Sequence, residues 1–242
     1  MLLESGAGLT YDAPMERQPF RRVLVAALVA CLALCASPVR ADDAPGIATA
    51  PATAGTPPAI VLADLATCAR TPEGYSANVE LHAKLHTFPF LSVTVHGTSS
   101  YRRPGLYHYQ LTNVPRIASK FDDLRYDLGD PTSWPARYDI VMAPGSTDEA
   151  PVLRLTPKKT GGQVAYLDIQ TDAKHGRMLK ATWTRHDGGT IVLTQTYAAL
   201  GSSDVVTAQH ATIDIPHMRA ELTATYTDLV VDTPTIATVN DR

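Results

Sequence analysis

From Gly74 onward, apolar and polar residues alternate along much of the chain with a period of two, which is typical of half-buried β-strands. In the first such segment, Val79, Leu81 and Leu85 fall on one face, while Glu80 and Lys84 fall on the other. Together with shorter segments between them, these patterns predict about nine to eleven strands. The clearest further segments are 91–101, 107–111, 152–156, 164–171, 178–183, 190–197 and 220–231.

Short glycine-containing turns separate these segments, at 103–105, 159–162, 175–176 and 187–189. Such connections are too short for the crossover that joins parallel strands, so they favour antiparallel hairpins. The sequence therefore predicts a mainly β fold.

Two segments depart from the alternation. Residues 59–70 group their apolar side chains as a short helix that packs on one face would. In 117–134, Phe121, Leu124 and Leu128 recur at helical spacing, which predicts one or two short helices there.

The N-terminal region has the pattern of a secretory signal peptide. Three arginines (Arg17, Arg21 and Arg22) precede an apolar run at 23–36, and small residues follow at 37–41. The apolar run is shorter than the roughly 20 residues that a membrane-spanning helix needs. We therefore expect residues 1–41 to be the signal peptide, with cleavage after Ala41.

Two alternatives remain open in this region. Residues 1–14 lack signal-peptide character, so Met15 is a candidate for the true start. Residues 28–31 also resemble a lipobox, which would leave the protein anchored through a lipidated Cys31.

After the cleavage site, residues 42–58 are rich in Pro, Ala, Thr and Gly and predict a flexible tether. The folded domain is expected over 59–242. Cleavage removes Cys31 and Cys35, so Cys68 is the remaining cysteine and no intramolecular disulfide is expected.

Charge and motifs argue against several classes of function. The formal charge of −3 comes without a basic tract, which disfavours nucleic acid as a partner. The motifs G-x-S-x-G, P-loop, H-E-x-x-H and G-x-G-x-x-G are missing from the sequence, so we predict neither enzyme activity nor a cofactor. His82 and His86 share a strand face but lie about 13 Å apart by the strand rise, too far for one metal ion.

Residues 97–109 (GTSSYRRPGLYHY) are similar to a segment of the LolA family of periplasmic lipoprotein carriers, in which an Arg-Pro turn is followed by alternating aromatic residues. A second similarity covers 134–140 and 152–158 (VLRLTPK) and continues through hairpin strands to Pro216. The segment 116–130 is shorter than its family counterpart, which usually contains an Asp-Gly-Lys hairpin.

The resemblance implies an unclosed antiparallel β-barrel around an apolar cavity, lidded by short helices. Arg103 matches the family arginine that binds carbonyls of the lid helix, and Tyr107, Tyr109 and Leu111 match positions that face the cavity. Four residues of the apolar alternation are predicted to form core or cavity wall: Leu81, Val93, Val95 and Leu193.

The implied function is a monomeric periplasmic carrier of acyl chains, whose partners are an acylated lipoprotein or other lipid, an inner-membrane release protein and an outer-membrane acceptor. The alternative is an envelope sensor or protein-interaction module, presented by the tether and by the C-terminal extension at 226–242. Related domains with one fold serve both kinds of role.

Overall fold

The computed structural model describes residues 56–67, 70–87, 90–103, 105–114, 123–127 and 130–232, with 123–127 described as backbone only. The predicted signal peptide, nearly all of the predicted tether and Cys68 lie outside the described residues. Their predicted roles therefore stay predictions.

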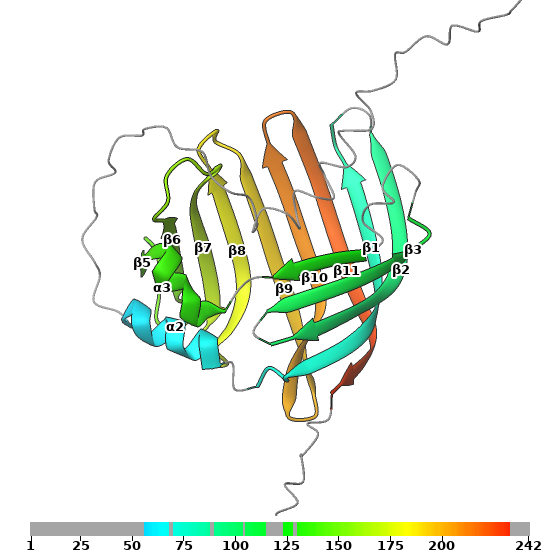
Figure 1. Ribbon diagram of the computed structural model, residues 1–242, viewed down its shortest axis with the longest axis horizontal. Coiled ribbons are helices and arrows are strands. Elements are labelled where there is room, and N and C mark those ends of the chain that lie inside the picture. The colour runs from blue at the N-terminus through cyan, green and yellow to red at the C-terminus, as the bar shows by residue number, and fades with distance from the viewer. Residues whose placement is uncertain are drawn as a thin grey trace, which may run out of the picture.

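The described residues form one sheet of eleven antiparallel strands that curves into an unclosed barrel (Figure 1). The strand order is β4-β3-β2-β1-β11-β10-β9-β8-β7-β6-β5. The fold class predicted from the alternation is confirmed. The strands are β1 (Gly74–Leu85), β2 (Leu91–Arg102), β3 (Leu106–Thr112), β4 (Asp123–Asp127), β5 (Tyr138–Met142), β6 (Val152–Pro157), β7 (Val164–Asp172), β8 (Arg177–Arg185), β9 (Thr190–Leu200), β10 (Ser203–Ile215) and β11 (Met218–Val231).

Short helices lie at the open side of the sheet. Helix α2 (Pro58–Thr67) begins with a proline, whose missing N–H costs nothing in the first helical turn. It buries Val61 and Leu65 and contacts β5, β6, β8 and the 3-10 helix η2 (Pro131–Ser133). Helix α3 (Trp134–Arg137) follows η2 directly and buries Trp134.

The helices predicted over 117–134 are partly wrong. Residues 131–137 are helical, but Asp123–Asp127 is strand β4, paired antiparallel with β3. The sequence DLRYD alternates with the period of a strand, and pairing with β3 satisfies the backbone groups on one side of this edge strand. The spacing of Phe121, Leu124 and Leu128 had suggested a helix instead.

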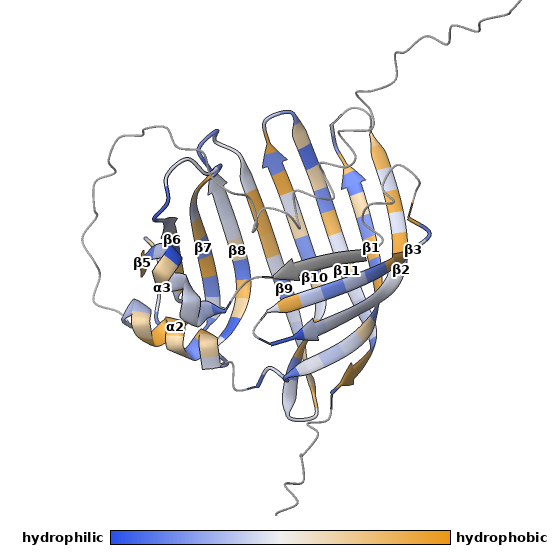
Figure 2. Cartoon of the chain, viewed as in Figure 1, coloured by the Kyte–Doolittle hydropathy of each residue, from blue (hydrophilic) through white to orange (hydrophobic). Residues whose placement is uncertain are grey.

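Hydrophobic and hydrophilic bands alternate along many of the strands in Figure 2, and the buried residues of this alternation face the inside of the barrel. Two buried cores form there. The helix-side core includes Val61, Leu65, Trp134 and Met178, together with residues of β6 to β11. The tyrosine-side core includes Tyr75, Tyr101, Tyr107, Tyr109 and Tyr226, together with residues of β1 to β3 and β10.

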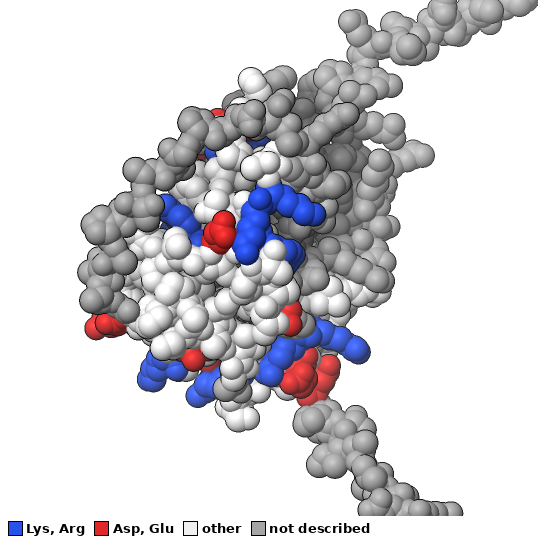
Figure 3. Space-filling model, turned by 60° about the vertical axis from the view of Figure 1, so that its left-hand side comes forward, with Lys and Arg blue, Asp and Glu red and all other residues white. Residues whose placement is uncertain are grey.

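Figure 3 shows the charged side chains of the face toward α2 and β5 in two groups, one across its upper middle and one along its lower edge, with a largely uncharged area between them. Ile60 on α2 and Val141 on β5 are about half exposed, at 51% and 52%. Within the described ranges, no helix is both long and apolar enough to cross a membrane.

Candidate functional site

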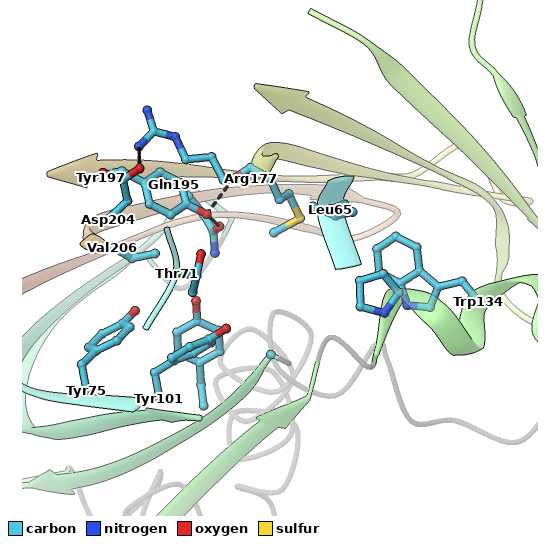
Figure 4. Close-up of a pocket in the computed structure, with 14 residues that line it drawn as sticks. Leu65, Thr71, Tyr75, Tyr101, Trp134, Arg177, Gln195, Tyr197, Asp204 and Val206 are labelled. Atoms are coloured by element: carbon cyan, nitrogen blue, oxygen red, sulfur yellow. Dashed lines mark hydrogen bonds and ion pairs between the residues drawn. The ribbon is translucent and has the colours of Figure 1, made fainter. Parts of the chain in front are cut away.

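A cavity lies where the two cores meet, and the volume open to a water-sized molecule is about 60 Å³. Binding sites for small molecules commonly measure about 300–1,000 Å³, so a larger ligand would have to move these walls apart. The lining comes from α2, the loop before β1, strands β1 to β3 and β8 to β10, and the η2–α3 segment (Figure 4). The lining residues are Leu65, Thr71, Tyr75, Tyr101, Gly105, Tyr107, Pro131, Trp134, Arg177, Met178, Gln195, Tyr197, Asp204 and Val206.

One side of the cavity is apolar. Leu65, Trp134 and Met178 belong to the helix-side core, and in Figure 4 Leu65 and Trp134 lie opposite the tyrosines. Because Leu65 comes from α2 and Trp134 from α3, the short helices supply this wall. An apolar ligand in contact with these residues would lose contact with water.

A second side consists of packed tyrosine rings. The ring centroids of Tyr75 and Tyr101 are 4.9 Å apart, as are those of Tyr101 and Tyr107. Burial raises the pKa of Tyr75 and Tyr107 well above the ordinary value, because the ionised phenol would lose its hydration. These hydroxyls therefore stay protonated at neutral pH, and this wall carries no charge.

The third side carries a network of charges that balance. Asp204, whose side chain is 6% exposed, forms ion pairs with Arg177 at 3.1 Å and with Arg70 at 3.0 Å, and its Oδ1 accepts a hydrogen bond from Arg70 Nη2 at 3.2 Å. Arg177 also contacts Asp172 at 3.1 Å, and its guanidinium stacks over the Tyr197 ring at 4.8 Å. Two guanidinium groups thus face two carboxylates, and the network presents no net charge to the cavity.

Asp172 is the most heavily contacted carboxylate of this network. Burial tends to raise its pKa, but hydrogen bonds from His175 and from the Lys174 backbone, with the charge of Arg177, outweigh burial and hold the pKa below the ordinary value. Asp172 is therefore ionised at neutral pH, as the charge balance requires.

Arg103 lies at the rim of the cavity, in the turn between β2 and β3. Its Nη2 donates to the carbonyl of Thr71, a lining residue, and its Nη1 lies 3.1 Å from Glu73 Oε1. The backbone N–H of Arg103 also donates to the Glu73 carbonyl at 2.9 Å. Arg103 thereby attaches the loop between α2 and β1 to the barrel.

Comparison with solved structures identifies the architecture. A DUF1329 family protein from Desulfovibrio piger superposes with a TM-score of 0.50 at 12% identity, over 74% of this chain and 95% of that one. A domain assigned to outer-membrane lipoprotein sorting, from Vibrio parahaemolyticus, gives 0.50 at 14% identity, over 72% and 92%. The fold is LolA-like.

A LolA superfamily protein from Nitrosomonas europaea gives a TM-score of 0.43 at 12% identity, over 74% of this chain and 95% of that one. No family model matches the chain, and no curated protein matches it in sequence. At these identities the likeness concerns the fold alone.

The predicted site residues all lie on or near the inner face of the LolA-like barrel, but the cavity brings few of them together. Tyr107 lines the cavity. Tyr109, Leu111 and Val95 are buried in the tyrosine-side core and do not appear in the lining. Leu81, Val93 and Leu193 are partly buried and pack against the two cores.

Arg103 contacts a carbonyl as the family resemblance implied, but the carbonyl belongs to Thr71 in the loop beyond α2, which ends at Thr67. The acceptor is thus a loop carbonyl rather than a helical one. The latching role of Arg103 stays a prediction.

Several lining residues escaped the sequence prediction, and β9 shows the signal that marks one of them. Ile191, Leu193, Gln195 and Tyr197 follow one another on the same face of the strand, and Gln195 is buried there. A polar residue within an inward-facing apolar register indicates a special site. Arg177 and Asp204 carry no comparable mark, because each stands near a strand end beside a turn.

The histidines that a metal site would need are separated in the structure. His82 contacts Thr94, His86 contacts Glu221 and His96 contacts Glu80. Among the described residues, no group of three or more His, Cys, Asp or Glu side chains is placed to hold a metal ion.

Proposed function

We propose that this protein binds acyl chains in the cavity and carries them, as part of a lipoprotein or other lipid, through the periplasm of a bacterial envelope. The observation that carries the proposal is the cavity itself, enclosed by a LolA-like barrel and short helices and walled by apolar side chains and protonated tyrosines.

The hydrophobic effect would stabilise an acyl chain that binds between these walls. Burying one methylene group is worth about 0.8 kcal/mol, so a long chain would gain on the order of 10 kcal/mol if fully enclosed. The charge-balanced network of Arg70, Arg177, Asp172 and Asp204 adds no net charge that would draw water to the ligand.

The cellular setting rests on the sequence. The signal peptide predicted over 1–41 supports export, with cleavage after Ala41 giving a freely diffusing carrier and lipidation of Cys31 giving an anchored one. A diffusing carrier would receive its cargo from an inner-membrane protein and deliver it to an outer-membrane acceptor.

The test is lipid recovery from the protein itself. Protein purified from the periplasm is analysed by native mass spectrometry and by lipid extraction, and the delipidated protein is titrated with a fluorescent fatty acid. We expect a bound lipid or lipoprotein and saturable binding of the probe. Recovery of bare protein together with no probe binding would contradict the proposal and leave the interaction-module hypothesis.

A pair of matched variants connects binding to the cavity. Val206 is 3% exposed and lines the cavity, so Val206→Phe adds volume where the ligand would lie. Val141, at 52% exposed on the edge strand β5, takes the same substitution outside the cavity. Probe affinity should fall for Val206→Phe and stay at the wild-type value for Val141→Phe.

A further inference from the structure

Gln195 brings a buried amide to the wall of the cavity. Gln195 is 7% exposed and lines the cavity beside Tyr197. Its Oε1 accepts from the Tyr197 hydroxyl at 2.7 Å. Its Nε2 is buried and has no hydrogen-bond partner among the described residues. In Figure 4 the amide points into the space between the tyrosines and Arg177.

A buried N–H group without an acceptor is unfavourable and uncommon in folded proteins. An apolar residue at position 195 would continue the register of Ile191 and Leu193 without that cost. Gln209 also has a buried Nε2 without a partner in the described part of the chain, but Gln195 lines the cavity, where an acceptor that arrives with a ligand can reach its donor.

The surroundings of Gln195 select the kind of acceptor. Arg177 and Arg70 are already matched by Asp172 and Asp204, so no positive charge remains to neutralise a free carboxylate. An amide N–H next to a charge-balanced network suits an uncharged carbonyl oxygen.

We propose that Gln195 Nε2 donates a hydrogen bond to the carbonyl oxygen of an ester- or amide-linked acyl chain, whose hydrocarbon lies against Leu65, Trp134 and Met178. This assignment rests on the proposed acyl-binding function and makes Gln195 a specificity-determining residue. It distinguishes acyl esters and amides from hydrocarbon chains without a carbonyl.

The Tyr197 hydroxyl is compatible with two orientations of the Gln195 amide. This hydroxyl has one proton and lies 2.9 Å from the Met178 carbonyl as well as 2.7 Å from Gln195 Oε1. With the amide turned over, Nε2 would donate to Tyr197 and the oxygen would face the cavity. The ligand would then have to supply a donor, so ligand chemistry separates the two orientations.

The experiment compares three ligands of equal chain length on the wild-type protein. Methyl palmitate supplies a carbonyl acceptor, methyl hexadecyl ether lacks the carbonyl, and hexadecanol supplies a hydroxyl donor. Each displaces a bound fluorescent apolar probe in a competition titration. We expect the ester to bind about fivefold to tenfold more tightly than the ether, the effect of one net hydrogen bond.

The variant Gln195→Met keeps the length of the side chain and removes the donor. It should bind ester and ether equally, with the ether at or above its wild-type affinity. Gln209→Met is the matched control, because Gln209 is also buried with a partnerless Nε2, accepts from Tyr226 at 2.7 Å and does not line the cavity. Gln209→Met should keep the ester preference.

The outcomes are separable. If none of the three ligands displaces the probe and no lipid is recovered, the acyl-binding function itself fails. If all three bind equally, acyl binding stands and the role of Gln195 is overturned. A preference for hexadecanol overturns the donor assignment, and equal loss of preference in Gln209→Met overturns the local assignment. The comparison of the three ligands on the wild-type protein tests the proposal even if a variant does not fold.

Discussion

Arg103 connects two parts of the chain that the cavity needs together. Its guanidinium contacts Thr71 and Glu73 in the loop after α2, while its backbone belongs to the turn between β2 and β3. A guanidinium has several donors in a fixed plane, so it can bind a carbonyl and a carboxylate at once. Thr71 lines the cavity, and movement of this loop would change access to it.

We therefore predict that Arg103→Leu leaves the fold intact and speeds the release of a bound fluorescent acyl probe several-fold. The loop loses the contacts that keep it closed, so the population of open states rises. Arg103→Lys should restore the rate only in part, because an ammonium lacks the planar fork. Stopped-flow dissociation measures the rate, and circular dichroism checks the fold.

Arg102 offers the control, since it is exposed and lies one residue earlier. Arg102→Leu should release the probe at the wild-type rate. Equal rates in all three variants and the wild type would make Arg103 an ordinary turn residue.

A second prediction concerns Asp204, whose buried carboxylate faces both Arg70 and Arg177. Asp204→Ala should lower the free energy of unfolding by about 3 kcal/mol, because it leaves the largely buried Arg177 without one of its partners. Urea denaturation measures the loss.

The control is Asp214→Ala, which breaks an ion pair with Arg219 whose side chains are 56% and 69% exposed. Exposed pairs contribute little, so this loss should stay below about 1 kcal/mol. Similar losses in both variants would show that the Asp204 network is not special.

Among the elements, those with a period of two over many residues were predictable from sequence. The strands β1, β2 and β7 to β9 lie close to the alternating segments, because each buries one face against a core. Strand β4 was not predicted, because its five residues also fit a helical spacing. Only the pairing with β3 shows that this segment is a strand.

The close approach of β2 and β3 depends on a single glycine, which the alternation of apolar and polar residues does not reveal. A Cβ at Gly97 would lie 2.0 Å from the Gln110 carbonyl oxygen of β3. Only glycine allows this approach between β2 and β3. The sequence places a glycine there, but the partner becomes known only with the register.

The contact of helix α2 with the β7–β8 turn gives a third prediction. Gly176 has a φ of +58°, and a Cβ there would lie 2.6 Å from the Asp64 carbonyl oxygen of α2. Gly176→Ala should displace α2 and lower the free energy of unfolding by about 1–3 kcal/mol. Hydrogen exchange should show faster opening of α2 in particular.

Gly188→Ala is the matched control, because Gly188 has a φ of +82° with nothing within 4 Å of the added Cβ. It should cost only the backbone strain, about 1 kcal/mol, without changing exchange in α2. If both variants change hydrogen exchange in α2 equally, the contact between Gly176 and Asp64 does not hold α2 in place.

At the scale of the whole molecule, the buried tyrosines predict sensitivity to alkali. Burial raises the pKa of Tyr109 from 10.0 to about 12, and burial also raises the pKa of Tyr75 and Tyr107. In the unfolded chain these phenols ionise near pH 10, whereas in the fold they stay protonated. The folded state then binds more protons, so stability falls as pH rises.

Below about pH 9, the buried tyrosines should not change the free energy of unfolding with pH. Above pH 10, each buried tyrosine should lower the free energy of unfolding by up to about 1.4 kcal/mol per pH unit. Denaturation at a series of pH values measures this slope. Tyr109→Phe should make the slope shallower between pH 10 and 12. An unchanged slope in that variant would show that Tyr109 does not titrate as described.

The candidate site was harder to predict than the fold. The resemblance around 97–109 led to Arg103 and Tyr107, which lie at the rim and in the wall of the cavity. The opposite wall, with Met178, Gln195 and Asp204, comes from strands distant in sequence. Alternation tells which residues face inward, but the curvature of the sheet decides which of them meet.

The strand order has a consequence for the time at which this cavity comes into existence. Strands that are neighbours in the sheet are also consecutive in the sequence, except for one pair, β1 and β11. Two meanders, β1 to β4 and β5 to β11, can thus form from local hairpins, and a single long-range pairing unites them. Tyr75 and Tyr107 come from the first meander, and Met178 and Gln195 from the second. The two halves of the cavity wall are joined when β1 pairs with β11, and a ligand that binds to both halves stabilises this long-range pairing by mass action.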